Sequence, residues 1–246
     1  MRGIVQINFT SRKISAKFLF LLLSLFSSTY SYAHVIRNAT VEFTRTLRKG
    51  KAEETTNGIL YCKIPEEILV YVDEPVCQWL SFENNSIKIY YPEDSIAFKL
   101  ISSYPVSFSF FNTFLNVMKE DFGLCDIGYI LSEHKIKGDT LITFWRPSKR
   151  LSKTIENLKL VYINNKIISC EVKRTDGEFM LKSFYREHFN YREYYFPMEI
   201  STTIFMDGDT IFETILYKNP VFNGSLPEEV KNFKIPEGIE IEEIKW

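Results

Sequence analysis

The feature that most constrains the fold of this chain is a succession of short β-type stretches separated by turn residues. Proline ends a hydrogen-bonded ladder and asparagine tolerates a positive φ, so both residues favour turns between strands. About eleven strands at a spacing of roughly ten residues predict an antiparallel sandwich or barrel. The clearest stretches in the first half are Ile59–Lys63, which Asn57-Gly58 precedes, and then Ile68–Val72, Cys77–Phe82, Ser86–Tyr91 and Ile96–Ile101.

The second half of the chain repeats this pattern. Asn164-Asn165 stands between the β-type stretches Leu158–Ile163 and Lys166–Lys173, and this arrangement predicts a hairpin. Near the start of the chain, Ala39–Leu47 also has the character of a strand. Further turns are expected at Gly138-Asp139, Asp176-Gly177 and Asp207-Gly208.

One segment has the periodicity of a helix instead. Between Ser107 and Leu124, apolar residues recur with the i, i+3, i+4, i+7 spacing of one helical face. We expect a helix there that interrupts the sheet, and a second short helical turn at Leu226–Asn232, where acidic residues follow a proline. The apolar positions of the first helix are Phe108, Phe111, Phe114, Leu115, Met118 and Phe122.

The first 33 residues have the pattern of a secretory signal peptide. Basic residues precede the apolar run Phe18–Phe26, and Ser31-Tyr32-Ala33 resembles a cleavage site. The alternative is an N-terminal membrane anchor, but the apolar run of about nine residues is too short to span a bilayer. We therefore expect residues 1–33 to be removed and residues 34–246 to form a single exported, soluble domain.

Composition narrows the classes of function. The chain has 246 residues and a formal net charge of −1, whereas a protein that binds nucleic acid through phosphate contacts usually carries a basic excess. We therefore expect no nucleic-acid partner. Cys62 and Cys77 flank neighbouring strands, and the sequence leaves a disulfide between them and burial as free thiols equally open.

No catalytic motif is visible in the sequence. A nucleophile elbow, a phosphate-binding loop, a dinucleotide fingerprint and the HExxH motif are all absent. The three histidines, His34, His134 and His188, do not have the spacing of metal ligands. We therefore expect neither an enzyme nor a cofactor or metal.

Aromatic residues are abundant, with 21 Phe and 14 Tyr. Four Phe lie in the predicted helix and Trp79, Phe82, Phe98 and Trp145 lie on nearby strands. These side chains either fill an ordinary core or line a cavity between a curved sheet and the helix. Such a cavity would suit an acyl chain, because each buried methylene contributes about 0.8 kcal/mol.

Three segments resemble motifs of the LolA-type periplasmic lipoprotein carrier family. Thr56–Pro65 is similar to its "G-x-L-x-x-K-x-P" strand, and Pro75–Pro92 is similar to the hairpin that follows, with Asn84-Asn85 in place of Asp-Gly. Asn232–Glu243 is similar to the closing "F-x-x-P-x-G-V-x-V" segment. Phe196-Pro197 and Asn219–Asn223 resemble the longer lipoprotein-sorting members. The resemblance extends over about residues 40–245.

This resemblance implies a mostly β fold in which an unclosed antiparallel β-barrel, a strongly curved sheet, covers a helical lid and an apolar cavity. It also implies a periplasmic carrier that receives an acylated lipoprotein, or another lipid, from an inner-membrane transporter and delivers it to an outer-membrane acceptor. Strand alternation puts Ile68, Val70 and Val72 on one face. The predicted lipid-binding residues are these three together with Trp79, Phe98, Phe108, Phe111 and Phe114.

The sequence departs from the family at two points. The family has an Arg just before the proline of the first motif, where this chain has Ile64 with Lys63 before it. The segment ahead of the first strand leaves little room for the family's N-terminal helix. These departures leave the cargo open: a lipid, a glycolipid, another amphiphile or no transported cargo. Two other functions also stay open: a structural β-domain of the cell envelope that binds a protein partner at a sheet edge, and a secreted hydrolase with scattered catalytic residues.

Overall fold

A single sheet of 14 strands dominates the part of the chain that the computed structural model describes, which is residues 35–64, 67–83, 85–101, 110–149, 155–206 and 208–245. Residues 1–33, the predicted signal peptide, lie outside the described residues. The strands are β1 Asn38–Lys49, β2 Ala52–Lys63, β3 Glu67–Glu74, β4 Gln78–Glu83, β5 Ser86–Tyr91, β6 Ile96–Ile101, β7 Tyr129–Lys137, β8 Thr140–Pro147, β9 Ile155–Ile163, β10 Lys166–Arg174, β11 Phe179–Tyr191, β12 Tyr194–Met206, β13 Asp209–Phe222 and β14 Ile241–Lys245.

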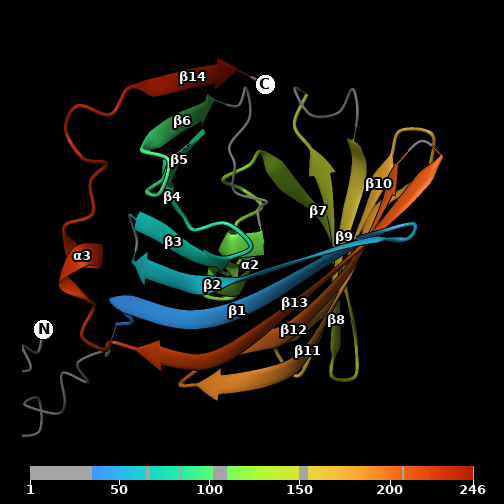
Figure 1. The fold of residues 1–246 in the computed structure, drawn as a ribbon. Coiled ribbons are helices and arrows are strands. Elements are labelled where there is room, and N and C mark those ends of the chain that lie inside the picture. Colours follow the sequence, from blue (N-terminus) through green and yellow to red (C-terminus); the bar gives the residue numbers. More distant parts are fainter. Residues whose placement is uncertain are drawn as a thin grey trace, which may run out of the picture. The chain divides into compact units, whose positions relative to one another are not determined.

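Two antiparallel meanders build this sheet. One runs from β1 to β6 and the other from β7 to β13, and they join where β1 pairs with β13. The C-terminal strand β14 is added beside β6 in parallel orientation. The described strands β7 and β14 are the two ends of the sheet and do not pair with each other. The prediction of a mostly β, unclosed and largely antiparallel sheet is therefore confirmed (Figure 1).

The structure confirms turns that the sequence predicts. Asn164 and Asn165 have φ values of 49° and 63° and join β9 to β10. Gly138, with φ of 61°, connects β7 and β8. Strands β5 and β6 have the bounds that the sequence predicts. The predicted strand Ala39–Leu47 lies within β1.

The start of β2 differs from the prediction. Asn57-Gly58 does not open the strand but lies inside it, because β2 begins at Ala52. The register against β3 shifts between Asn57 and Gly58. An added Cβ at Gly58 would lie 2.2 Å from the carbonyl oxygen of Tyr71, so glycine here allows a close approach of two strands rather than a turn.

The helices are shorter than predicted. Helix α2 covers Phe110–Asn116 and is followed by turns to residue 128, whereas the pattern predicts a helix over Ser107–Leu124. The carboxylate of Asp121 accepts hydrogen bonds from the backbone N–H groups of Gly123 and Cys125, which favours turns over helix. Helix α3 covers Glu228–Lys231, within the segment predicted to be helical. Neither described helix is a lid of the length that the family resemblance implies.

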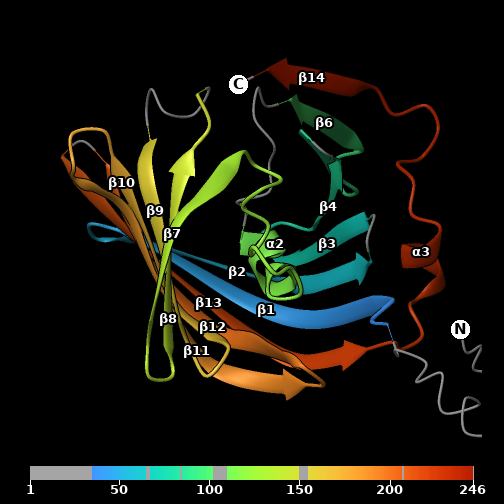
Figure 2. The same ribbon diagram turned by 180° about the vertical axis from the view of Figure 1, so that it is seen from behind.

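The described helices also lack the length and apolar character that a membrane-spanning segment requires. Helix α2 lies on the concave side of the curved sheet, which we call the inner face (Figures 1 and 2). The inner face carries the main core, whose centre includes Val41, Leu60, Val70, Phe114 and Phe196, each at most 1% exposed. The opposite side is the outer face.

The outer face of β2–β4 is covered by the segment that follows β13. Leu226, just before α3, and Val230, within α3, pack with Tyr61 and Leu69 in a second buried cluster. Phe233 extends this cluster by stacking on Trp79 with ring centroids 4.9 Å apart. The sheet is thus packed on both faces at β2–β4.

Candidate functional site

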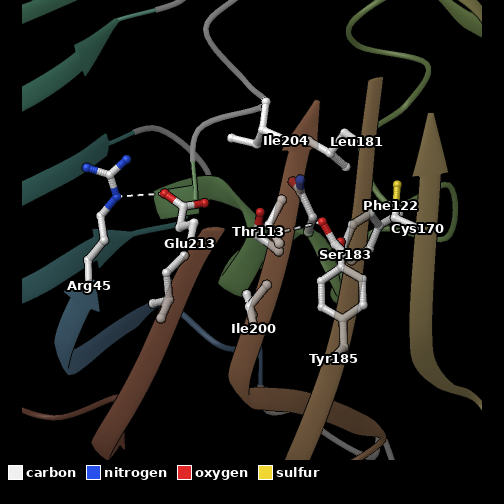
Figure 3. Close-up of a pocket in the computed structure, with 13 residues that line it drawn as sticks. Arg45, Thr113, Phe122, Cys170, Leu181, Ser183, Tyr185, Ile200, Ile204 and Glu213 are labelled. Atoms are coloured by element: carbon white, nitrogen blue, oxygen red, sulfur yellow. Dashed lines mark hydrogen bonds and ion pairs between the residues drawn. The ribbon is translucent and has the colours of Figure 1, made fainter. Parts of the chain in front are cut away.

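A cavity of about 350 Å³ lies between the inner face of β10–β13 and the α2 region. Helix α2 and the turn after it contribute Thr113, Asn116 and Phe122, and β1 contributes Arg45. The strands contribute apolar side chains such as Ile200 and Ile204, and polar ones such as Ser183 and Glu213 (Figure 3). The cavity therefore has apolar walls and a polar part.

Strand register brings the lining residues together. Tyr185 lies opposite Ile200, which lies opposite Ile215. In the neighbouring row of residues, Ser183 lies opposite Thr202, and Thr202 lies opposite Glu213. Directly opposed residues in antiparallel strands point to the same face, so each row presents its side chains to the cavity.

The polar part contains two hydroxyl groups and an ion pair. The Oγ atom of Ser183 and the Oγ1 atom of Thr202 are 2.9 Å apart, and both residues are buried. The Nε atom of Arg45 donates a hydrogen bond of 2.7 Å to Oε1 of Glu213, whose side chain is 11% exposed. The ion pair adds no net charge to the cavity, while the hydroxyl groups add hydrogen-bonding capacity.

Burial keeps the Cys170 thiol and the Tyr185 hydroxyl of the lining neutral. Desolvation raises the pKa of the Cys170 thiol to about 12, and it raises the pKa of Tyr185 well above its ordinary value. A thiol with such a pKa is not a nucleophile at neutral pH. The chemistry that this lining supports is binding through apolar contact and hydroxyl hydrogen bonds.

The predicted residues of β3 lie on the inner face, but in the packed core. Val70 and Val72 are at most 2% exposed, and Ile68 packs against the same cluster. Phe114 is fully buried, with its ring centroid 4.9 Å from that of Phe196. None of these four residues lines the cavity, and their role in lipid binding stays a prediction.

Two predicted residues lie apart from this group. Trp79 lies opposite Tyr71 and faces the outer side, where it stacks on Phe233. Phe98 faces the inner side on β6, since it lies opposite Ile89 in the row that continues from Val70. The structure therefore does not bring Trp79 together with the others. Phe108 lies outside the described residues, and only the backbone of Phe111, within α2, is described.

Lys63 also faces the outer side. Its Nζ atom contacts Oε2 of Glu67 at 2.7 Å and the carbonyl oxygen of Lys231, in α3, at 3.0 Å. It therefore ties the outer segment to β2, and it does not reach α2 on the inner side. Strand alternation explains this, because the preceding residue, Cys62, points into the core.

The remaining candidate residues for metal binding or catalysis do not form a group. His134 is on β7, and His188 is on β11, where its Nε2 atom is 2.8 Å from the carbonyl oxygen of Ile167. His34 lies outside the described residues. In the described ranges, no group of three or more His, Cys, Asp or Glu residues is placed to hold a metal ion. All four cysteines are free thiols, so the structure does not pair Cys62 with Cys77.

The sequence did not predict the row of polar side chains that borders the cavity beneath α2. Ser183 and Thr202 resemble ordinary polar positions in strands that alternate between two faces. Only the register between β11 and β12 shows that they meet on the buried side. The available signal was alternation within β12, where Ile200, Thr202 and Ile204 share one face.

Comparisons with known proteins find solved structures that are similar to this one. The chain is similar to a LolA superfamily protein from Nitrosomonas europaea, with a TM-score of 0.54, 16% identity, and coverage of 78% of this chain and 89% of that one. A DUF1329 family protein from Desulfovibrio piger gives a TM-score of 0.57 at 13% identity, covering 81% and 91%. A domain from Vibrio parahaemolyticus, named for outer membrane lipoprotein sorting, gives 0.54 at 9% identity, covering 79% and 89%.

These similarities show a shared LolA-like fold. No protein-family model and no curated protein matches the sequence.

Proposed function

We propose that this protein is a non-enzymatic carrier that encloses the acyl chain of a lipoprotein, or of another lipid, on the inner face of its sheet. The observation that carries this proposal is the cavity of about 350 Å³ between β10–β13 and α2, in a fold shared with a LolA superfamily protein. A partly enclosed cavity with mostly apolar walls shields an acyl chain from water, and each methylene removed from water contributes about 0.8 kcal/mol.

The setting that we propose is the periplasm, after removal of residues 1–33. The carrier would take its cargo from an inner-membrane transporter and release it to an outer-membrane acceptor. The signal-peptide pattern supports export. The similarity to a domain named for outer membrane lipoprotein sorting supports this direction of transport.

The test is ligand capture by the protein purified from the cell envelope without detergent. Native mass spectrometry is expected to show bound mass that organic solvent extracts as lipid, or an acylated protein that copurifies. The emptied protein is expected to take up a fluorescent acyl probe. A measured mass equal to that of the protein alone, together with no probe uptake, would contradict the carrier function and favour the alternative of a structural or interaction domain.

A cavity-filling variant locates the site. Ile204 lines the cavity and is only partly buried, so the larger ring in Ile204→Trp occupies cavity space and is expected to abolish probe uptake. Thr203→Trp is the matched control, because the neighbouring residue of the same strand points to the outer face, opposite Phe212. Normal uptake by a folded Ile204→Trp variant would place the binding site elsewhere.

A further inference from the structure

The inner face differs in chemistry between its two halves. On β3–β6 one row of directly opposed residues is entirely apolar. On β10–β13 another row of directly opposed residues contains a carboxylate, two hydroxyls and a thiol. The apolar row is Val70, Leu80, Ile89 and Phe98, and the polar row is Glu213, Thr202, Ser183 and Cys170. Of these two rows, the polar row borders the cavity and the apolar row does not.

The hydroxyl groups of this row have more protons than their mutual hydrogen bonds use. The Oγ atom of Ser183 and the Oγ1 atom of Thr202 share one hydrogen bond. Each hydroxyl has one proton to donate and two lone pairs that accept. The one bond between these two hydroxyls therefore uses one of their two protons. The second proton can be donated to a ligand atom that accepts hydrogen bonds.

The volume of the cavity limits the size of the ligand. A protein cavity of about 150 Å³ holds one benzene molecule. By that proportion, a cavity of about 350 Å³ holds on the order of 14 carbon-sized atoms. This is room for one acyl chain of medium length and not for two chains side by side.

We propose that the cavity binds a single acyl chain and places the carbonyl group at the end of that chain against Ser183 and Thr202. The ligand class is a fatty acid or a monoacyl ester, and this inference rests on the carrier function proposed above. The carbonyl oxygen accepts the hydroxyl proton, and the chain lies against the apolar wall that includes Ile200 and Ile204. The ion pair of Arg45 with Glu213 is neutral overall, so an ester carbonyl and the neutral carboxyl group of a fatty acid both suit the site.

The test compares ligands of the same headgroup and tail length, with and without an acyl carbonyl group. Lysophosphatidylcholine with a 12-carbon acyl chain and dodecylphosphocholine share the phosphocholine headgroup and tail length, but only the former has a carbonyl, on a glycerol linker that the latter lacks. Dodecanoate represents the free acid. Calorimetric titration below the micellar concentrations is expected to show about tenfold tighter binding of the carbonyl ligands than of dodecylphosphocholine. Comparison of the two carbonyl ligands distinguishes the ester from the free acid as the preferred source.

The matched variants locate the carbonyl group. Combined Ser183→Ala and Thr202→Val substitutions are expected to remove the preference for a carbonyl, leaving the affinity for dodecylphosphocholine within about threefold of its original value. Thr202→Ser keeps the hydroxyl and is expected to keep the preference. Thr203→Val makes the same chemical change on the outer face and is expected to keep it too. Retention of the preference in the combined variant would overturn the inference.

The chain-length dependence tests the volume argument. Affinity for fatty acids is expected to rise about fourfold per methylene and then level off near the chain length that fills the cavity. Equal binding of dodecylphosphocholine and the carbonyl ligands would overturn this inference and leave the carrier function intact. Binding of none of these amphiphiles would refute both proposals. Binding of a two-chain lipid as tightly as a one-chain lipid would contradict the single-chain limit.

Discussion

Replacing Phe114 by Ala tests whether the ring of α2 is core or cavity wall. Phe114 is fully buried, and its ring centroid lies 4.9 Å from that of Phe196 and 5.0 Å from that of Tyr217. Removing a core phenylalanine costs about 3–5 kcal/mol, because the lost burial adds to the cavity left behind. In a domain of this size each kcal/mol lowers Tm by about 2–4 °C, so the expected drop is roughly 6–20 °C.

Urea denaturation followed by circular dichroism measures this loss in the free energy of unfolding. Phe212→Ala is the matched control, because Phe212 is 44% exposed and its main partner is the guanidinium of Arg48, 5.2 Å from the ring centroid. The control is expected to lose less than about 1.5 kcal/mol. A loss at Phe114 as small as that of the control would mean that its ring adjoins open space. The assignment of Phe114 to the core would then be wrong.

Three further predictions concern stability and reactivity. Gly58→Ala is expected to lower the free energy of unfolding by more than about 2 kcal/mol in urea titration, because its Cβ would lie 2.2 Å from the backbone oxygen of Tyr71. A maleimide at pH 8 is expected to label exposed Cys125 and not buried Cys170, whose pKa is raised to about 12, until the protein unfolds. Burial lowers the pKa of His188, so the unfolded chain binds its proton more readily. Stability is therefore expected to fall as pH drops below about 6.5, and His188→Gln is expected to flatten that part of the stability–pH curve.

Local signals in the sequence predicted the β architecture because the structure of each turn depends on a few adjacent residues. Asn164 and Asn165 adopt positive φ, as the hairpin between β9 and β10 requires. Prolines and asparagines bracket β5 and β6 closely enough that their bounds were predicted correctly. The parallel pairing of β14 with β6 has no such signal, because the two strands are separated by most of the chain.

The position of the site could not be predicted in the same way, because it depends on register between strands. Whether a residue faces the inner or the outer side changes with every step along a strand, and the loop from β3 to β4 sets the phase of β4. Trp79 consequently lies opposite Tyr71 and faces outward, although its aromatic character suggested the cavity. Ser183 and Thr202 come together for the same reason, since they are brought opposite each other only by the pairing of β11 with β12.

The outer face is covered at β2–β4, whereas the cavity lies on the inner side of β10–β13. Strands β2–β4 are packed on both sides, by the core on the inner face and by the segment around Val230 and Phe233 on the outer face. On β11 and β13, the outer side chains of Phe184, Phe212 and Leu216 are 37–45% exposed, so no segment among the described residues packs over them as α3 does over β2–β4. Strands packed on one side lose fewer contacts when they shift, and they open locally at lower free energy. The proposed carrier must widen its cavity to load and release a chain, and we expect the strands that move to be β10–β13, which lie apart from the packing of Trp79 against Phe233.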